Sequence, residues 1–544
     1  MIKKFVNALI AKNGYRGASL ILIVTLICSN ILGLLRNRFL AQHIPQYNLD
    51  TYLAAFRIPD FLFNLLVLGA ISAVFIPIFT QMLEEGKTKE AWYITNSIIN
   101  LLLASIIILS VVLFFLMPYL MNWLVPGFDA FQKGQTIQLA RLLLLSPLFF
   151  SLSYVFGGVL NSFRRFFVYS IAPLLYNTAI IVSIFIFAPK FGVWGIGLGV
   201  IIGAFLHMFI QVPVVFKLGW RWKPSFDFRN AEVKSMGKLM IPRVIGLASA
   251  QIILLVFTFL ASRNAGGVTY FNFANDIQTF FSVVFGSSFA IAIFPILSKY
   301  AFKNADKFFD NLRICFKQIL YFTLPFVILI IMLRTEIVRI LLGTGFYDWN
   351  ATVITANTLG AFAIGVWATS LIQLFARAFY AKKDTMTPTI IALISAGITI
   401  GLGFLFTNTN IRFLNMSVVG LATAFSIGSI VNFILLVIFM KDARTFWTKS
   451  LLYEIFKYLM ALIIVIFVAQ GLKILFGSLV NMQTLVGVVI KTVATFVVAL
   501  GVYILLTYLW GVREISAFVK IFKRKVVLEK SEQEAVVEKG QTEG

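Results

Sequence analysis

The stretch from Leu101 to Met117 reads LLLASIIILSVVLFFLM, seventeen consecutive residues without a charge or an amide. It lies within a longer segment, residues 91–124, that contains no Asp, Glu, Lys or Arg. A helix of about twenty apolar residues is long enough to cross the hydrocarbon of a bilayer. This segment therefore predicts a transmembrane helix, and it decides the fold class of the chain.

Similar apolar segments recur along the whole sequence, and only short polar loops separate them. Backbone groups in lipid must be bonded within the protein, and a helix of this length satisfies its own. We predict an all-α polytopic membrane protein with about 14 transmembrane helices. The expected spans are residues 17–41, 52–83, 91–124, 136–160, 168–188, 193–216, 235–262, 268–301, 309–343, 351–380, 386–407, 415–440, 451–474 and 483–510.

The composition of the 544-residue chain agrees with a membrane environment, because 60% of the residues are hydrophobic and 12% are charged. Soluble domains carry roughly 25% charged residues. The net charge of +24 does not indicate a nucleic-acid partner, since the basic residues lie in loops between apolar runs. No nucleotide loop, catalytic triad or metal-ligand cluster is present in the sequence. We therefore expect a transporter rather than an enzyme, with no cofactor and no metal.

The basic residues are concentrated in alternate loops, which predicts the orientation of the helices. Cytoplasmic loops of membrane proteins carry an excess of Lys and Arg. With a cytoplasmic N-terminus, and an even number of helices, both termini lie in the cytoplasm and the chain is a multi-pass protein of the inner membrane. The basic inner segments are then residues 87–89, 164–165, 217–238, 299–317, 377–383, 441–449 and the tail.

The sequence contains an internal repeat. Residues 51–79 resemble residues 269–297, and residues 160–173 resemble residues 376–388, at offsets of 215 to 218 residues. Chance recurrence among apolar residues is the alternative. Duplicated halves that enclose a midplane site are typical of transporters. We predict two six-helix lobes around a central cavity, followed by two further helices; the segments are 1–220, 221–445, 446–512 and a charged cytoplasmic tail, 513–544.

Four stretches resemble the MurJ (MviN) family of lipid II flippases. Residues 29–38 read SNILGLLRNR, residues 50–60 read DTYLAAFRIPD, residues 69–77 read GAISAVFIP, and residues 376–388 read ARAFYAKKDTMTP. They are similar to the family patterns S-R-x-x-G-x-x-R-[DE], D-A-F-x-x-A-F-[RK]-x-P-N, E-G-A-F-x-x-A-F-x-P and A-R-A-F-Y-A-x-x-D-T-x-T-P. Their order and spacing make the resemblance more specific than any single motif.

The resemblance implies a fold of the multidrug/oligosaccharidyl-lipid/polysaccharide exporter superfamily, with a V-shaped cavity and alternating access. The implied cargo is lipid II, the undecaprenyl-diphosphate-linked peptidoglycan precursor, which moves from the inner to the outer leaflet for cell-wall synthesis and cell shape. Membrane lipids are the other partners, and we expect a monomer.

A lipid II flippase needs cations inside the membrane, because an unshielded diphosphate is costly there. Arginine suits this task, since its planar fork meets phosphate oxygens in pairs. Arg36 matches the essential Arg of the family and is assigned to the diphosphate; a snorkelling side chain at the interface is the alternative. Arg57, Asn30 and Arg243 are the other candidates for substrate binding, with an interface anchor as the second interpretation of Arg243.

Asp50, Pro59 and Asp60 form one part of a candidate gate. Asp50 either caps the helix that it opens or pairs with Arg36 across the outer gate. Pro59 bends its helix by removing a backbone hydrogen bond. Asp60 lies three residues from Arg57, so the two charges either act in the moving gate or neutralise each other.

Asn275 and Asp276 complete the candidate gate from the eighth predicted helix. An acid within a membrane helix is a functional candidate by default. Asp276 either pairs with Arg36 or Arg57, or binds a coupling cation.

The sequence departs from the family at several cationic positions. The first family Arg is Asn30 here, the acid after the second Arg is Asn37, and Asp276 replaces a cavity Arg. Two explanations compete. Either the protein recruits other cations, such as Arg57 and Arg141, for the same cargo, or the fold persists with a changed cargo.

Four functions follow from these observations. The first is lipid II translocation, and the second is export of another lipid-linked oligosaccharide or cation-coupled antiport of a drug. An antiporter needs an acidic cavity, for which Asp60 and Asp276 are the evident candidates. A membrane glycosyltransferase is disfavoured, because the sequence has no D-x-D pair beside a sizeable loop. A scaffold that retains only the fold would fill the cavity with apolar side chains.

Overall fold

The computed structural model describes residues 15–68, 75–225, 231–410, 415–440, 443–512 and 514, and every regular element within them is a helix. The all-α fold class predicted from the apolar segments is therefore confirmed. The elements are α2 (Tyr15–His43), α3 (Gln46–Ala55), α4 (Arg57–Phe63), η1 (Asn64–Leu68), α5 (Ile76–Glu84), α6 (Thr88–Leu124), α7 (Ala130–Leu143), α8 (Ser146–Ser162), α9 (Phe166–Ile186), α10 (Ala188–Phe191), α11 (Val193–Phe209), α12 (Val212–Lys217), α13 (Ala231–Ala261), α14 (Gly267–Ser282), η3 (Val283–Ser287), α15 (Ser288–Tyr300), α16 (Ala305–Met332), α17 (Arg334–Leu341), α18 (Trp349–Ala381), α19 (Met386–Phe406), α20 (Ser417–Ile438), α21 (Ala443–Phe446), α22 (Lys449–Leu479) and α23 (Leu485–Leu509).

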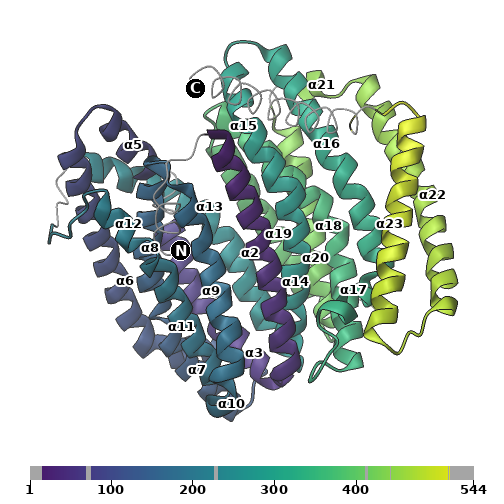
Figure 1. The fold of residues 1–544 in the computed structure, drawn as a ribbon, viewed down its shortest axis with the longest axis horizontal. Helices are drawn as coiled ribbons and strands as arrows, with labels where there is room; N and C mark the ends of the chain where they lie inside the picture. The colour runs from purple at the N-terminus through teal and green to yellow at the C-terminus, as the bar shows by residue number, and fades with distance from the viewer. Residues whose placement is uncertain are drawn as a thin grey trace, which may run out of the picture.

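The helices form two lobes that lie side by side (Figure 1). Helices α2 to α12 build the N-lobe, and α13 to α20 build the C-lobe. Helix α2 packs on α9 of the N-lobe and also touches α14 and α17 of the C-lobe. The last two helices, α22 and α23, pack on α16 and α17 at the edge of the C-lobe farthest from the N-lobe. They therefore extend the C-lobe instead of joining the two lobes.

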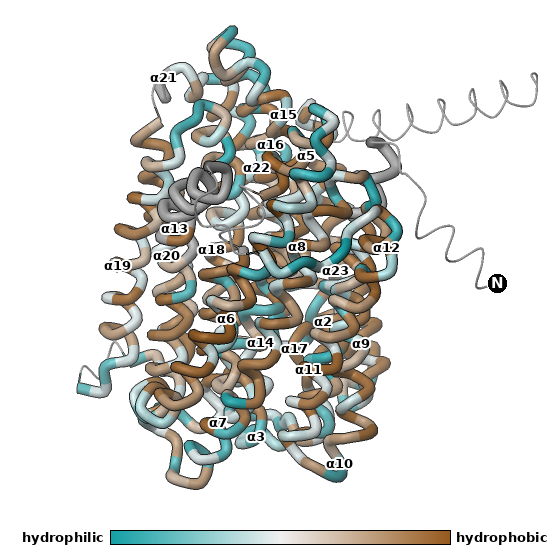
Figure 2. Tube along the Cα trace, turned by 90° about the vertical axis from the view of Figure 1, so that its left-hand side faces the viewer, coloured by the Kyte–Doolittle hydropathy of each residue, from teal (hydrophilic) through white to brown (hydrophobic). Residues whose placement is uncertain are grey.

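Eleven helices in the described part of the chain are long and apolar enough to cross a membrane. Apolar residues predominate across the middle of the bundle and hydrophilic ones at its two ends (Figure 2). The remaining expected spans correspond to α2, to α13 and to the interrupted segment from α3 to α5. The total of fourteen stays a prediction.

The segment expected as one helix over residues 52–83 is broken. Helix α3 ends at Ala55, and α4 begins at Arg57. Pro59 has no N–H to donate to the carbonyl of Ala55, four residues earlier, so the break falls where the proline removes the hydrogen bond. A π-helical segment, η1, follows at Asn64–Leu68. Its counterpart in the C-lobe, η3 at Val283–Ser287, lies close to the offset of the sequence repeat.

Other local features recur at the same spacing. Asp129 caps α7 by accepting a hydrogen bond from the backbone N–H of Gln132 (2.9 Å), and Asp348 caps α18 by accepting one from Ala351 (2.7 Å). These matched caps lie 219 residues apart. Matches among apolar residues can arise by chance. The matched polar caps are a similarity of the two halves that does not depend on apolar residues.

The buried apolar residues show where the lobes meet. Following the orientation predicted from the basic loops, we call the end that carries α3, α10 and α17, at the bottom of Figure 1, the outer end, and the opposite end the inner end. One apolar cluster joins N-lobe residues such as Tyr52 to Phe257 and Phe271 of the C-lobe. The inner half of the C-lobe has a separate core that includes Phe308 and Phe375. The lobes are thus packed together in their outer half.

A buried ion cluster attaches the last two helices to the C-lobe. Glu336 of α17 is 3.0 Å from the ammonium group of Lys491 in α23 and 3.3 Å from that of Lys473 in α22. Glu336 and Lys491 are both 7% exposed. Breaking a buried pair is costly, because the partner left behind keeps its charge without compensation.

We expect Glu336→Gln to lower the free energy of unfolding by roughly 3–5 kcal/mol, since two lysines lose their counter-ion. Thermal unfolding of the purified protein in detergent measures the change. Glu85→Gln is the matched control, because Glu85 is exposed and forms a 2.8 Å surface pair with Lys87. Equal melting temperatures for the two variants would contradict a stabilising role of the cluster.

Candidate functional site

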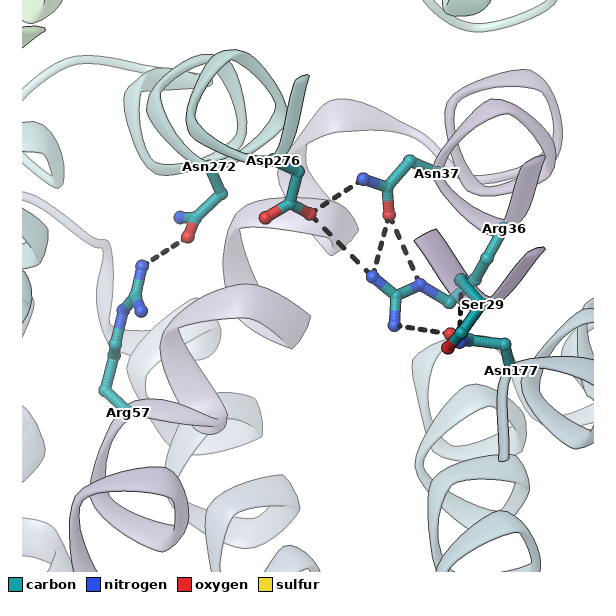
Figure 3. A network of polar contacts seen from close by, with 7 residues as sticks. All are labelled: Ser29, Arg36, Asn37, Arg57, Asn177, Asn272 and Asp276. Atoms are coloured by element: carbon teal, nitrogen blue, oxygen red, sulfur yellow. Dashed lines mark hydrogen bonds and ion pairs between the residues drawn. The ribbon is translucent and has the colours of Figure 1, made fainter. Parts of the chain in front are cut away.

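Arg36 lies at the centre of a polar network between the lobes (Figure 3). Its guanidinium donates to the side-chain oxygen of Asn37 from two nitrogens (3.1 and 3.3 Å) and to that of Asn177 of α9 (3.2 Å). One of its nitrogens also lies 3.8 Å from the carboxylate of Asp276 in α14. Asn37 donates to the same carboxylate at 2.8 Å. Arg36 therefore connects α2 and α9 of the N-lobe to α14 of the C-lobe.

A cavity of about 250 Å³ opens beside this network. Arg36 and Asp276 lie on its wall, and 21% and 42% of their side chains are exposed. An arginine anchored in lipid headgroups would instead face away from the bundle. Arg36 faces the space between the lobes. The cavity is lined by Ser29, Asn30, Gly33, Leu34, Arg36, Tyr176, Asn177, Asp276 and Thr279.

Arg57 makes a second connection between the lobes. Its Nε donates to the hydroxyl of Thr258 in α13 at 2.7 Å, and another nitrogen donates to the side-chain oxygen of Asn272 in α14. Asn272 and Asp276 are four residues apart on α14, so they lie on one face of that helix. Figure 3 shows this face directed towards both arginines.

Asp60 and Arg57 do not form a direct ion pair in the part of the chain that the structure describes. The guanidinium of Arg57 turns instead to the hydroxyl and amide acceptors of the C-lobe. Arg57 is the first residue of α4, and α4 packs against α13. The charges of Arg57 and Asp60 still act on each other at longer range. Mutual neutralisation and a role in the moving gate therefore both stay predictions.

The other predicted site residues are placed as follows. Asn30 lines the cavity and donates to the carbonyl of Leu26 in its own helix (2.8 Å). Asn275 accepts a hydrogen bond from Gln278 (3.1 Å). The side chain of Arg243 lies outside the described residues. Arg141 donates to the carbonyl of Phe114 and lies 4.5 Å from the centre of its ring, so it does not join the Arg36 network.

Asp50 closes the outer end of the space between the lobes. Its carboxylate accepts hydrogen bonds from the backbone N–H of Gly266 (2.8 Å), and from the N–H and hydroxyl of Thr269 (2.8 and 2.7 Å). These groups lie at the N-terminus of α14. Both sequence interpretations of Asp50 are therefore wrong: it neither caps its own helix, which follows Pro45 without a side-chain cap, nor pairs with Arg36. It caps a helix of the opposite lobe.

Close backbone contacts reinforce this closure. A Cβ atom at Gly345 of the C-lobe would lie 2.0 Å from the carbonyl oxygen of Gln42 in α2, and one at Gly127 of the N-lobe would lie 2.2 Å from that of Ser262. The hydroxyl of Tyr270 also donates to Gln46 at 2.9 Å. Only glycine allows the two loops to approach the opposite lobe so closely.

Sequence reasoning missed the neutral members of the site. Asn177 and Thr258 hold the two arginines, yet neither carries a charge that would draw attention. The available signal was a polar amide within the apolar segment 168–188. The sequence showed Asn37 only as a position where the family has an acid. Its bridging role depends on the position of Asp276 in α14, which the sequence does not give.

The comparisons with known proteins agree with this architecture. The family model described as "Lipid II flippase MurJ" matches residues 46–495. The chain belongs to the MurJ family of lipid II flippases. A protein of Haemophilus influenzae named probable lipid II flippase MurJ is 28% identical over 75% of this chain and 83% of its own length. A protein of the same name from Rhizobium tropici is 25% identical over 93% of this chain and 96% of its own length.

Solved structures share the fold of this chain. A structure titled "Lipid II flippase MurJ, inward closed conformation" matches with a TM-score of 0.75 and 24% identity, covering 90% of this chain and 98% of that one. An inward-facing MATE transporter of the MOP superfamily matches with a TM-score of 0.62 and 15% identity, over 75% of this chain and 92% of that one. The predicted two-lobed helical fold is thereby confirmed.

We expect Asp50→Ala to open the outer end, because Gly266 and Thr269 lose a charged acceptor that contributes about 2 kcal/mol. A Ser29→Cys thiol, in a Cys28→Ala background, reports on the cavity wall. An impermeant maleimide added from outside should label it several-fold faster in the Asp50→Ala variant.

Asp129→Ala is the matched control for this measurement. Asp129 is also an outer-end acid that caps a helix, but its partners Gln132 and Tyr47 belong to the same lobe. Its loss should leave the labelling rate unchanged. Equal acceleration by both variants would mean that the closure does not depend on Asp50.

Proposed function

We propose that this protein moves lipid II from the inner to the outer leaflet of the cytoplasmic membrane by alternating access. The observation that carries the proposal is the position of Arg36, which faces a polar cavity between the lobes of a MurJ-family fold. A guanidinium there gives the diphosphate a partner while it is removed from water. Arg57 supplies a second cation between the same lobes, and Asn30 and Arg243 complete the proposed binding set.

The packing of the lobes supports a loading direction. The outer end is closed by Asp50 and by the glycine contacts, whereas the inner halves of the lobes have separate cores. In this conformation the cargo would enter from the inner leaflet. Asp50, Pro59, Asp60, Asn275 and Asp276 are proposed to act in the gate that later releases it outward.

The pairing of Asp276 counts against a drug antiporter. Such a transporter needs an acid that is available to a cation, and Asp276 is bonded to Asn37 and lies next to Arg36. An anionic cargo suits the two arginines better.

The domain limits and orientation predicted from the sequence belong to the same proposal. The lobes are residues 1–220 and 221–445, the added helices are 446–512, the tail is 513–544, and both termini are cytoplasmic. The turns after α5 and α15, which were predicted as inner loops, both lie towards the upper end of the molecule in Figure 1. This common position supports the orientation. A monomer with these two lobes contains the whole proposed site.

Two exposed phenylalanines provide a test of the orientation. Phe302 follows α15 at the inner end and Phe346 precedes α18 at the outer end, and they are 68% and 57% exposed. In a Cys28→Ala background, an impermeant thiol reagent applied to intact cells should label Phe346→Cys and not Phe302→Cys. The reverse pattern would invert the proposed topology.

The function is tested by replacing a cell's own lipid II flippase with this protein. Complemented cells should build a normal wall, whereas depletion should cause lipid II to accumulate in the inner leaflet. Arg36→Ala and Arg57→Ala should each reduce lipid II translocation about tenfold or more, since each removes a charge-assisted contact of roughly 1.5–3 kcal/mol. Translocation is measured by the access of an external lipid II-cleaving enzyme to labelled precursor.

Arg141→Ala is the control for these variants. It removes an arginine that lies over Phe114, outside the Arg36 network. Translocation should be retained. Failure of the unaltered protein to support wall synthesis, despite normal expression in the membrane, would reject the proposed function.

A further inference from the structure

Both arginines of the site contact the opposite lobe. Arg36 of α2 faces Asp276 of α14, and Arg57 of α4 is held by Thr258 and Asn272. The donors that a diphosphate would use are therefore the donors that connect the lobes. Cargo binding and these connections compete for the same N–H groups.

Asp276 differs from the other acceptors in this network. Asn37, Asn177, Thr258 and Asn272 offer neutral oxygens, whereas Asp276 offers a carboxylate. Among the described residues of this network, Asp276 is thus the acceptor that carries a charge. With Arg36 it forms a pair of zero net charge on the cavity wall.

The geometry of this pair makes it easy to displace. The closest approach of Arg36 and Asp276 is 3.8 Å, and Asn37 provides the shorter contact to the carboxylate at 2.8 Å. The Asp276 side chain is 42% exposed towards the cavity. A loose and partly solvated ion pair contributes little free energy. A diphosphate carries more charge and meets the guanidinium with two oxygens, so it makes the stronger contact.

We propose that Asp276 is a built-in competitor of the cargo: it occupies Arg36 when the cavity is empty, and the lipid diphosphate must displace it. The inference rests on the proposed function and deepens it. Asp276 weakens binding of every anion at Arg36 by the same amount, because each must break the same pair. Only an anion that makes a strong contact of its own with Arg36, as a diphosphate does, then loads the cavity.

Displacement also connects loading to movement of the lobes. When the diphosphate takes Arg36, the carboxylate of Asp276 loses its cation, and the contact between α2 and α14 is broken at the level of the cavity. The connection at the outer end through Asp50 is separate and stays in place. Loading therefore loosens the middle of the interface before the outer gate opens.

The proposal is tested with farnesyl diphosphate, a soluble lipid diphosphate, and with farnesyl phosphate, titrated into the purified full-length protein by calorimetry. Asp276→Asn keeps the shape of the side chain and removes its charge. We expect it to bind farnesyl diphosphate about threefold more tightly than the unaltered protein, which corresponds to about 0.7 kcal/mol, as a partly exposed ion pair contributes. Its gain for the monophosphate should be about the same, because both ligands displace the same pair.

A double-mutant cycle separates local competition from a general charge effect. In an Arg36→Ala background, Asp276→Asn should give no gain, because the competition is for Arg36 itself. Asp306→Asn, which removes an exposed acid at the start of α16, should leave both affinities unchanged. A gain that persists without Arg36, or no gain with Arg36 present, would overturn the proposal.

Two further results keep the outcome interpretable. Thermal unfolding confirms that each variant is folded, and Asp276→Ala provides a second charge-free variant if the Asn form is unstable. A protein that fails to support wall synthesis, yet shows the gain for farnesyl diphosphate, refutes the lipid II function and leaves the competition standing. A protein that supports wall synthesis without the gain refutes the competition alone.

Discussion

The high cost of an unpaired charge in hydrocarbon is the constraint on which this structure depends. Arg36 and Arg57 lie within a bundle whose surroundings are apolar, so each needs oxygen acceptors from the protein. Those acceptors come from both lobes. The contacts that satisfy the arginines therefore also join the two halves of the molecule, at the proposed cargo-binding site.

At the outer end, a buried carboxylate must likewise be compensated. Asp50 is 2% exposed, and it is compensated by the free N–H groups at the start of α14. A helix N-terminus attracts a negative charge, because its first N–H groups have no partner in the helix. One buried charge at each level thus links the lobes: Asp50 at the outer end, and Arg36 at the cavity. The two links differ in strength, since Asp50 is fully enclosed and Asp276 is half-exposed.

Several parts of the site were accessible from the sequence, and others were not. Arg36 and Asp276 stood out because charged residues are rare in apolar segments, and the break near Pro59 follows from its missing N–H group. The partner of Asp50 could not be predicted, because a carboxylate next to its own helix gives no sign that it caps another one 216 residues away. Asn177 and Thr258 were missed because neutral polar residues are common in membrane helices.

The sequence by itself determined the membrane environment, the all-helical class and the family, because hydrophobic length, charge distribution and motif order are properties of the linear chain. It also identified the rare intramembrane charges. Only the tertiary structure decided which of these charges meet. Arg57 donates hydrogen bonds to the opposite lobe, and Arg36 lies next to Asp276, 240 positions further along the chain. Such pairings depend on how two lobes rest against each other, and no local pattern encodes that relation.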